Sequence, residues 1–146
     1  MIADSRTSVA FTGHRTYRGT AADALRRTVG ELYARGFRNF LSGMAVGFDL
    51  AAAEAVLELR ERAPGVRLVA AVPFRGQEMR FSPADRERFR RVLAEADSVE
   101  VLAPAYHRGC YAVRNDFLVD NARVLVAWYD GSPGGTRYTV RRALGR

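Results

Sequence analysis

The chain has 146 residues, of which 48% are apolar and 27% charged, and this composition fits a single globular domain over residues 1–146. No apolar run reaches the roughly 18 residues of a membrane-spanning helix, and a single cysteine, Cys110, excludes an internal disulfide framework. The first residues, MIADSRTS, lack the apolar core of a signal peptide. We therefore expect a cytoplasmic protein with no membrane partner.

The formal net charge is +7, and all 23 basic residues are arginine. A basic surface attracts phosphate groups, whether in nucleic acid or in a small nucleotide. The alternative is that most arginines lie on solvated helix faces, and this is our prediction for a group in the second half of the chain. The group is Arg88, Arg90, Arg91, Arg141 and Arg142.

Five short apolar runs alternate with segments of helical pattern. The runs are SVAF (8–11), FRNFL (37–41), VRLVAAV (66–72), SVEVL (98–102) and RVLVAWY (123–129). The third and fifth are nearly continuous in apolar residues, which is typical of parallel strands covered on both faces. The alternation predicts an α/β fold, a Rossmann-like doubly wound domain with a mainly parallel sheet of about five strands and helices on both faces.

Capping signals predict where the intervening helices begin. Thr20 with Asp23 fits a capping box, Asp49 is the expected N-cap of an alanine-rich helix, and Ser82 before a proline opens another helix. The residues expected to face inward are Leu25, Val29, Leu32, Phe89, Val92, Leu93 and Ala96.

The polar and glycine-rich segments all follow the predicted strands. They are TGHR (12–15), SGMAVG (42–47), PFRGQ (73–77), PAYHRGCYAVRN (104–115) and DGSPGGT (130–136). In an open parallel sheet, ligands bind beyond the carboxyl ends of the strands, near the point where the strand order reverses. The sequence therefore predicts a ligand site at this edge of the sheet.

Two glycine-rich junctions lead from a strand into a helix. Gly43 and Gly47 flank the first junction, where glycine lets a phosphate approach backbone amides at a helix N-terminus. Asp49 either occupies those amides as an N-cap or reaches a ribose hydroxyl. Residues 134–136 (GGT) form the second junction and offer amides and a hydroxyl. The alternative for both junctions is an ordinary strand–helix turn.

Several side chains at this edge are candidates for chemistry. Arg15 is suited to clamping a phosphate, and His14 to hydrogen bonding or acid–base work. Arg114 lies early in a predicted helix, where its charge opposes the helix dipole, which favours a functional role. His107 and Cys110 are close in sequence, but this does not make a nucleophile–base pair. Two histidines and one cysteine, without clustered carboxylates, predict no metal site.

Taken in order, these segments resemble the YpsA-like family of the SLOG superfamily, from about Val9 to Ala143. SGMAVGFD is similar to a stretch of the DNA-processing protein DprA, and PGGT is similar to the start of a motif in the LOG cytokinin-activating enzymes. The resemblance implies a Rossmann-like domain that binds nucleotides or nucleotide-derived ligands. After PGGT the chain reads RYTVRR, without the catalytic glutamate of the LOG motif.

The motifs and the resemblance together define the predicted ligand-binding residues. These are Gly13, His14, Arg15, Ser42, Gly43, Met44, Gly47, Asp49, Gln77, Arg114, Asn115, Asp130, Gly131, Gly134, Gly135 and Thr136.

Three functions follow from these observations, the first being the leading hypothesis. It is a binding or sensor domain for a nucleotide-type small molecule such as an adenine nucleotide, NAD or ADP-ribose, with no other cofactor assigned. The second is cleavage of a nucleotide N-glycosidic bond, for which Asp49, Asp130, Asp120 and, for proton transfer, His14 are the candidates. The third is binding of single-stranded nucleic acid, with stacking by Tyr17, Tyr106, Tyr111 and Tyr138. The sequence leaves open whether the chain forms a homodimer.

Overall fold

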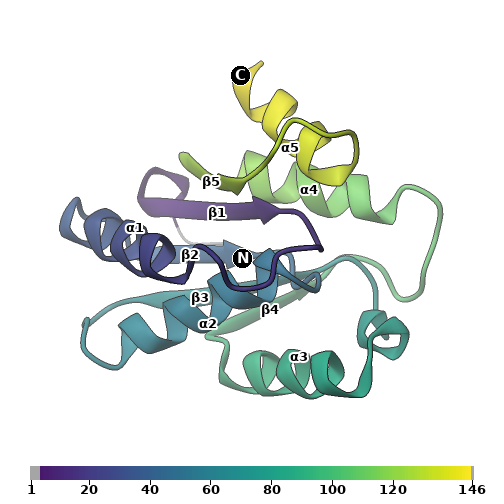
Figure 1. Cartoon of the computed structure of the whole chain (residues 1–146), viewed down its shortest axis with the longest axis horizontal. Coiled ribbons are helices and arrows are strands. Elements are labelled where there is room, and N and C mark those ends of the chain that lie inside the picture. Colours follow the sequence, from purple (N-terminus) through teal and green to yellow (C-terminus); the bar gives the residue numbers. More distant parts are fainter. Residues whose placement is uncertain (1–3, 146) are drawn as a thin grey trace.

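The computed structural model describes residues 4–145 and has one sheet of five parallel strands in the order β4-β3-β2-β1-β5 (Figure 1). The strands are β1 (Ser8–Gly13), β2 (Asn39–Ser42), β3 (Arg67–Val72), β4 (Ser98–Val101) and β5 (Val124–Trp128). Each overlaps one of the five predicted apolar runs, so the prediction of a Rossmann-like α/β fold is confirmed.

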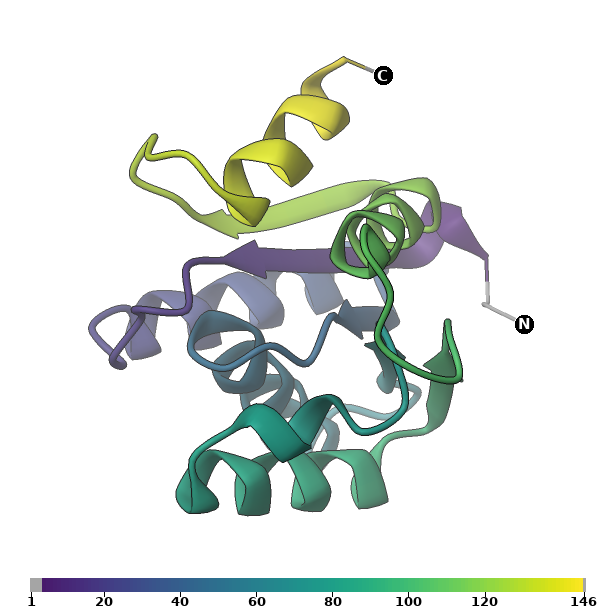
Figure 2. The ribbon, with the colours of Figure 1, turned by 90° about the vertical axis from the view of Figure 1, so that its right-hand side faces the viewer.

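Helices cover both faces of this sheet (Figures 1 and 2). They are α1 (Ala22–Ala34), α2 (Phe48–Arg60), α3 (Pro83–Glu95), α4 (Cys110–Asp120) and α5 (Gly135–Leu144), with short 3₁₀ segments η1 (Ser5–Thr7) and η2 (Gln77–Arg80). Strand residues alternate between two cores, as the pleat requires. Phe11 and Phe40 pack with α1, α2 and α3, whereas Ala10 and Leu41 pack with Leu118 of α4.

The two edge strands are less buried than the three central ones. β3 is buried from Leu68 onward, as its continuous apolar run predicts. Residues 124–128 form a similarly continuous apolar run, but β5 pairs with β1 alone and its residues are half-buried or exposed. Its side chains still pack on both faces, with Val124, Val126 and Trp128 against the first core and Leu125 against the second. The run is therefore covered on both faces, but less completely than β3.

Two of the three predicted helix caps differ in the structure. Ser82 caps α3 as expected, accepting a hydrogen bond from the amide of Asp85. Thr20 is not a cap, because α1 begins after Ala21 without a side-chain cap and the amide of Ala21 donates to the hydroxyl of Tyr17.

Asp49 is not the N-cap of α2. The N-cap is Gly47, with φ 82°, and Asp49 is the second residue of the helix. Glycine is needed here because a Cβ atom on Gly47 would lie 2.5 Å from the carbonyl oxygen of Arg15. The Asp49 side chain is therefore free of the capping role and turns toward the loop before the helix, where Oδ2 accepts a long hydrogen bond (3.4 Å) from the amide of Ala45.

Among residues 4–145, no helix is both long and apolar enough to cross a membrane.

Candidate functional site

A cleft of about 260 Å³ lies beyond the carboxyl end of β1. The chain builds β1 to β4 outward in one direction and then returns to place β5 on the other side of β1. The strand order therefore reverses between β1 and β5, where ligand sites of such sheets lie. The lining residues are Thr12, Gly13, His14, Arg15, Ala45, Asp49, Tyr111, Arg114, Asn115, Gly135 and Thr136.

The cleft brings together half of the predicted ligand-binding residues, from four separate segments. They are Gly13, His14, Arg15, Asp49, Arg114, Asn115, Gly135 and Thr136. Thr12 and Ala45 also line the cleft; they lie inside the predicted segments but were not singled out as site residues. Tyr111 also lies inside a predicted segment (104–115), but it was considered only for stacking on nucleic acid and not as a residue of this cleft.

The remaining predicted residues lie around the cleft and do not line it. They are Ser42, Gly43, Met44, Gly47, Gln77, Asp130, Gly131 and Gly134. Several of them support its walls. The hydroxyl of Ser42 donates to the carbonyl of Asp49 and accepts from the amide of Met44, and the amide group of Gln77 donates to the carbonyl of Met44.

Gly43 supports the cleft by letting Arg114 approach the backbone. A Cβ atom at Gly43 would lie 2.7 Å from Cδ of Arg114. Nη1 of Arg114 donates to the Gly43 carbonyl at 2.6 Å, and Nε donates to Oδ1 of Asn115 at 2.8 Å. The glycine is thus explained by packing against this side chain, which is itself 5% exposed.

Asp49 and Arg114 form the charged centre of the cleft. Both are about 95% buried, and Oδ1 of Asp49 accepts no hydrogen bond. Burial raises the pKa of Asp49 to about 6, although the charges of Arg114 and Arg15 and the Ala45 amide act in the opposite direction. Burial also lowers the pKa of Arg114, against the stabilising charge of Asp49. A buried carboxyl with an unused oxygen is positioned for a hydrogen-bond donor from a ligand.

Tyr111 holds two guanidinium groups at the cleft. The Cζ atoms of Arg15 and Arg114 lie 5.2 and 5.6 Å from the centre of its ring, within the range of cation–π attraction. Within residues 4–145 the guanidinium of Arg15 makes no hydrogen bond, and Nη2 of Arg114 makes none either. Their free donors are therefore available to an anion.

The start of α5 supplies the opposite wall. Its N-cap, Gly134, has φ 138° and no side chain, so no side chain caps the first amides of the helix. Thr136 is buried, and Gly135 lies against Asn115. Uncapped amides and the positive end of the helix dipole favour an anion at this wall.

Two carboxylates considered for catalysis do not line the cleft. Asp130 is 71% exposed and pairs with Nε2 of His14 at 3.0 Å. Hydrogen bonds from Ser132 hold its pKa below the ordinary value, with a smaller contribution from His14. Asp120, at the end of α4, pairs with Arg142 at 3.0 Å. Asp49 is therefore the only one of the three carboxyls that lines the cleft.

The arginines assigned to helix faces are largely neutralised. Arg88 pairs with Glu54 and Asp85, and Arg90 lies 3.9 Å from Glu78. Arg142 bonds to carboxylates on α4. All five lie on α3 or α5, four of them exposed and Arg88 half-buried, which agrees with the prediction of solvated helix faces; the ion pairs were not predicted. In the part of the chain that the structure describes, no three His, Cys, Asp or Glu residues are grouped to hold a metal ion.

Comparison with solved structures supports this fold. The chain is similar to DNA processing protein A (DprA) from Streptococcus pneumoniae, with a TM-score of 0.68 and 19% identity over 96% of this chain and 47% of that one. It is also similar to DprA from Helicobacter pylori, a structure described for its single-stranded DNA binding mode, with a TM-score of 0.66 and 19% identity over 95% of this chain and 61% of that one. At this identity the likeness establishes the fold.

Comparison with curated sequences identifies closer relatives. A UPF0398 protein of Shouchella clausii is 38% identical over 94 residues, covering 62% of this chain and 50% of the relative. Another, from Halalkalibacterium halodurans, is 29% identical over 126 residues, covering 84% of this chain and 67% of the relative. The chain thus spans between half and two thirds of the length of these relatives. Residues 10–145 match the YspA SLOG family, designated YpsA. The chain belongs to the YspA SLOG family.

Proposed function

We propose that the cleft binds the phosphate and sugar of a nucleotide or nucleotide-derived molecule, such as an adenine nucleotide, NAD or ADP-ribose. The observation that carries this proposal is the meeting of Arg15, Arg114 and the buried carboxyl of Asp49 at the switch point of the sheet. Two cations and an unused carboxyl oxygen match a ligand that carries both an anion and hydroxyl groups.

The phosphate is assigned to the side of the cleft between Arg15 and the start of α5. Arg15 has five unused donors, and a planar guanidinium matches phosphate oxygens with two parallel hydrogen bonds. The uncapped amides at Gly135 and Thr136 add donors from the helix N-terminus. Arg114 is held by Gly43 and Asn115, so it offers a fixed positive charge rather than a mobile one.

The sugar is assigned to Asp49. Its Oδ1 lacks a hydrogen-bond partner, and a ribose hydroxyl would supply one. The ionised carboxylate is the better acceptor, so this contact is strongest above the pKa of about 6.

Thermal melting against a panel of nucleotides tests this proposal. A ligand at about 100 times its dissociation constant stabilises the fold by about 2.7 kcal/mol, which raises Tm measurably. We expect Arg15→Ala to lose this response. Arg141→Ala, which removes the same charge from the exposed side of α5, serves as the matched control and should keep it. Absence of a shift with every nucleotide at millimolar concentration would contradict the proposal.

One observation favours a second function, cleavage of an N-glycosidic bond. Such a reaction needs a carboxyl near the anomeric carbon of the sugar, and Asp49 lines the cleft with a pKa raised to about 6 by burial. Chromatography of nucleoside monophosphates incubated with the protein would detect released base. Product that persists in Asp49→Asn would exclude this carboxyl, whereas intact nucleotides with a clear thermal shift would identify a binding protein.

A further inference from the structure

We propose that a nucleobase attached to the cleft-bound sugar phosphate stacks on Tyr106, at the outer end of an aromatic shelf formed by Phe74, Tyr106 and Tyr111. This inference rests on the proposed function of the cleft and specifies which chemical class of ligand completes it. The ligand is a base-bearing nucleotide rather than a free sugar phosphate.

The shelf is continuous with the cleft. Tyr111 lines the cleft, and its ring centre lies 6.0 Å from that of Phe74 and 6.3 Å from that of Tyr106. Phe74 and Tyr106 meet edge to face at 5.5 Å. Phe74 is 4% exposed and anchors the shelf, whereas Tyr106 is 50% exposed. A ligand that leaves the cleft past Tyr111 therefore reaches an aromatic surface that is already ordered.

Arg80 completes the shelf on its outer side. Its Cζ lies 4.4 Å from the ring centre of Tyr106 and 5.5 Å from that of Phe74. Within residues 4–145 this guanidinium has no carboxylate partner. The guanidinium lies over one face of Tyr106, so a nucleobase would stack on the opposite face of this half-exposed ring. Aromatic rings and arginine planes both stack on nucleobases, which makes this pair a suitable surface.

The size of the cleft also favours a second surface for the base. At about 260 Å³ it is smaller than the roughly 300–1,000 Å³ of pockets that enclose a whole drug-sized ligand. Its lining is polar and charged near Arg15, Asp49 and Arg114, which suits a phosphate and a ribose. The base, which is flat and largely apolar on its faces, is better accommodated on Tyr106.

Isothermal titration calorimetry with two ligands tests the shelf. Adenosine monophosphate carries the base, and ribose 5-phosphate lacks it. We expect Tyr106→Ala to weaken binding of the nucleotide at least about 5-fold, the lower end of the effect of removing a stacking aromatic. Binding of ribose 5-phosphate should be unchanged, and Tyr106→Phe should restore nucleotide affinity because it keeps the ring.

Tyr33 provides a matched control. It also stacks with an arginine, the Cζ of Arg38 lying 3.9 Å from its ring centre, but it lies on α1, outside the cleft and the shelf. Tyr33→Ala removes an equivalent ring and should leave both affinities unchanged. Circular dichroism of each variant verifies that the fold is retained.

The possible outcomes separate the shelf from the cleft. If Tyr106→Ala binds the nucleotide as tightly as the unmodified protein does, the shelf proposal is wrong and the proposal for the cleft stands. If the unmodified protein binds neither ligand, the cleft proposal fails and the shelf proposal fails with it. If only an oligonucleotide binds, and its binding depends on Tyr106, the shelf serves single-stranded nucleic acid and our assignment to a mononucleotide is overturned.

Discussion

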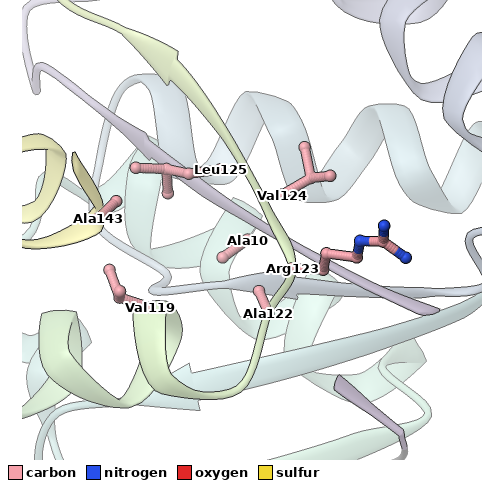
Figure 3. Close-up of a pocket in the computed structure, with 7 residues that line it drawn as sticks. All are labelled: Ala10, Val119, Ala122, Arg123, Val124, Leu125 and Ala143. Atoms are coloured by element: carbon pink, nitrogen blue, oxygen red, sulfur yellow. The ribbon is translucent and has the colours of Figure 1, made fainter. Parts of the chain in front are cut away.

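The cleft at the end of β1 differs sharply from a larger groove between α4, α5 and the sheet (Figure 3). The groove has a volume of about 450 Å³, against about 260 Å³ for the cleft. Its lining consists of Ala10, Val119, Ala122, Arg123, Val124, Leu125 and Ala143. Six of these seven residues are apolar, and Figure 3 shows short side chains with a single guanidinium. We therefore base the proposed site on the convergence of polar groups and not on volume.

The physical reason lies in how each cavity is made. The groove exists because small residues such as Ala10 and Ala143 leave space beside β5, an edge strand. The cleft exists because parallel strands deliver their following loops, and the helix N-termini after them, to one edge of the sheet. That edge receives unpaired amides and charged side chains, so we expect an anion to bind there and not in the groove.

The largest expected effect on the free energy of unfolding comes from removing Arg114, the buried cation of the cleft. Arg114→Met removes the main opposing charge of the buried Asp49 carboxyl and leaves the Gly43 carbonyl and Oδ1 of Asn115 without their donor. Each buried polar group left unsatisfied costs about 1–3 kcal/mol, and more if it is charged. Urea denaturation at pH 7 should show this loss. The loss should be smaller at pH 4.5, where Asp49 is protonated. Adding Asp49→Asn to the same chain should recover stability, and a double variant no more stable than Arg114→Met would contradict the coupling.

Asp49→Asn alone should abolish a pH dependence of stability that the buried carboxyl confers. Between pH 3.8 and about 6 the folded chain keeps a proton that the unfolded chain has lost, so stability falls as pH rises through this window and levels off above it. The full change is about 3 kcal/mol, from roughly two pKa units at 1.36 kcal/mol each. Asparagine cannot ionise, so the free energy of unfolding of the variant should lack this dependence. If the free energy of unfolding depends on pH in the same way in both proteins, Asp49 is not the cause of the pH dependence.

Nucleotide affinity should fall in the same variant. If the carboxylate accepts a ribose hydroxyl, Asp49→Asn weakens nucleotide binding because a charged acceptor is replaced by a neutral one. A variant that loses the pH dependence of stability and keeps its affinity would assign Asp49 a role outside ligand binding.

Gly135→Val should block the cleft at little cost to folding. The unusual backbone conformation belongs to Gly134, with φ 138°, whereas a Cβ atom at Gly135 has its nearest contact at 3.5 Å, with Nδ2 of Asn115. We therefore expect a folding cost of about 1 kcal/mol or less. Nucleotide affinity should fall more than about 10-fold, because the valine methyl groups enter the cleft at the start of α5, where the phosphate is expected to bind. Calorimetry and thermal melting would measure the two effects separately. Normal binding in a folded Gly135→Val protein would show that this glycine is only a turn residue.

The smallest effect is expected in the groove. Ala143→Val adds the same β-branched side chain as Gly135→Val but beside the apolar lining, so it should change the free energy of unfolding by about 1 kcal/mol or less and leave nucleotide affinity unchanged. Reduced nucleotide affinity in this variant would contradict the proposal that the cleft, and not the groove, binds the nucleotide.

The sequence by itself determined the sheet and the edge at which polar residues gather. Hydrophobic periodicity is a local property, so the runs at 66–72 and 98–102 can be identified without their neighbours. Parallel strands joined by helices then place segments such as 12–15 and 130–136 at the same end of the sheet. This much follows from chain direction alone.

Only the tertiary structure decided which of those residues meet and what each one does. Arg114 packs on Gly43, 71 residues earlier, and no local pattern reveals that contact. The same contact supplies the countercharge of Asp49, which the sequence presented as a helix cap. Asp120 was an equal candidate, yet it lies at the far end of α4 and pairs with Arg142. Side-chain roles of this kind depend on distances and burial between segments far apart in the chain, and these quantities exist only once the layers have packed.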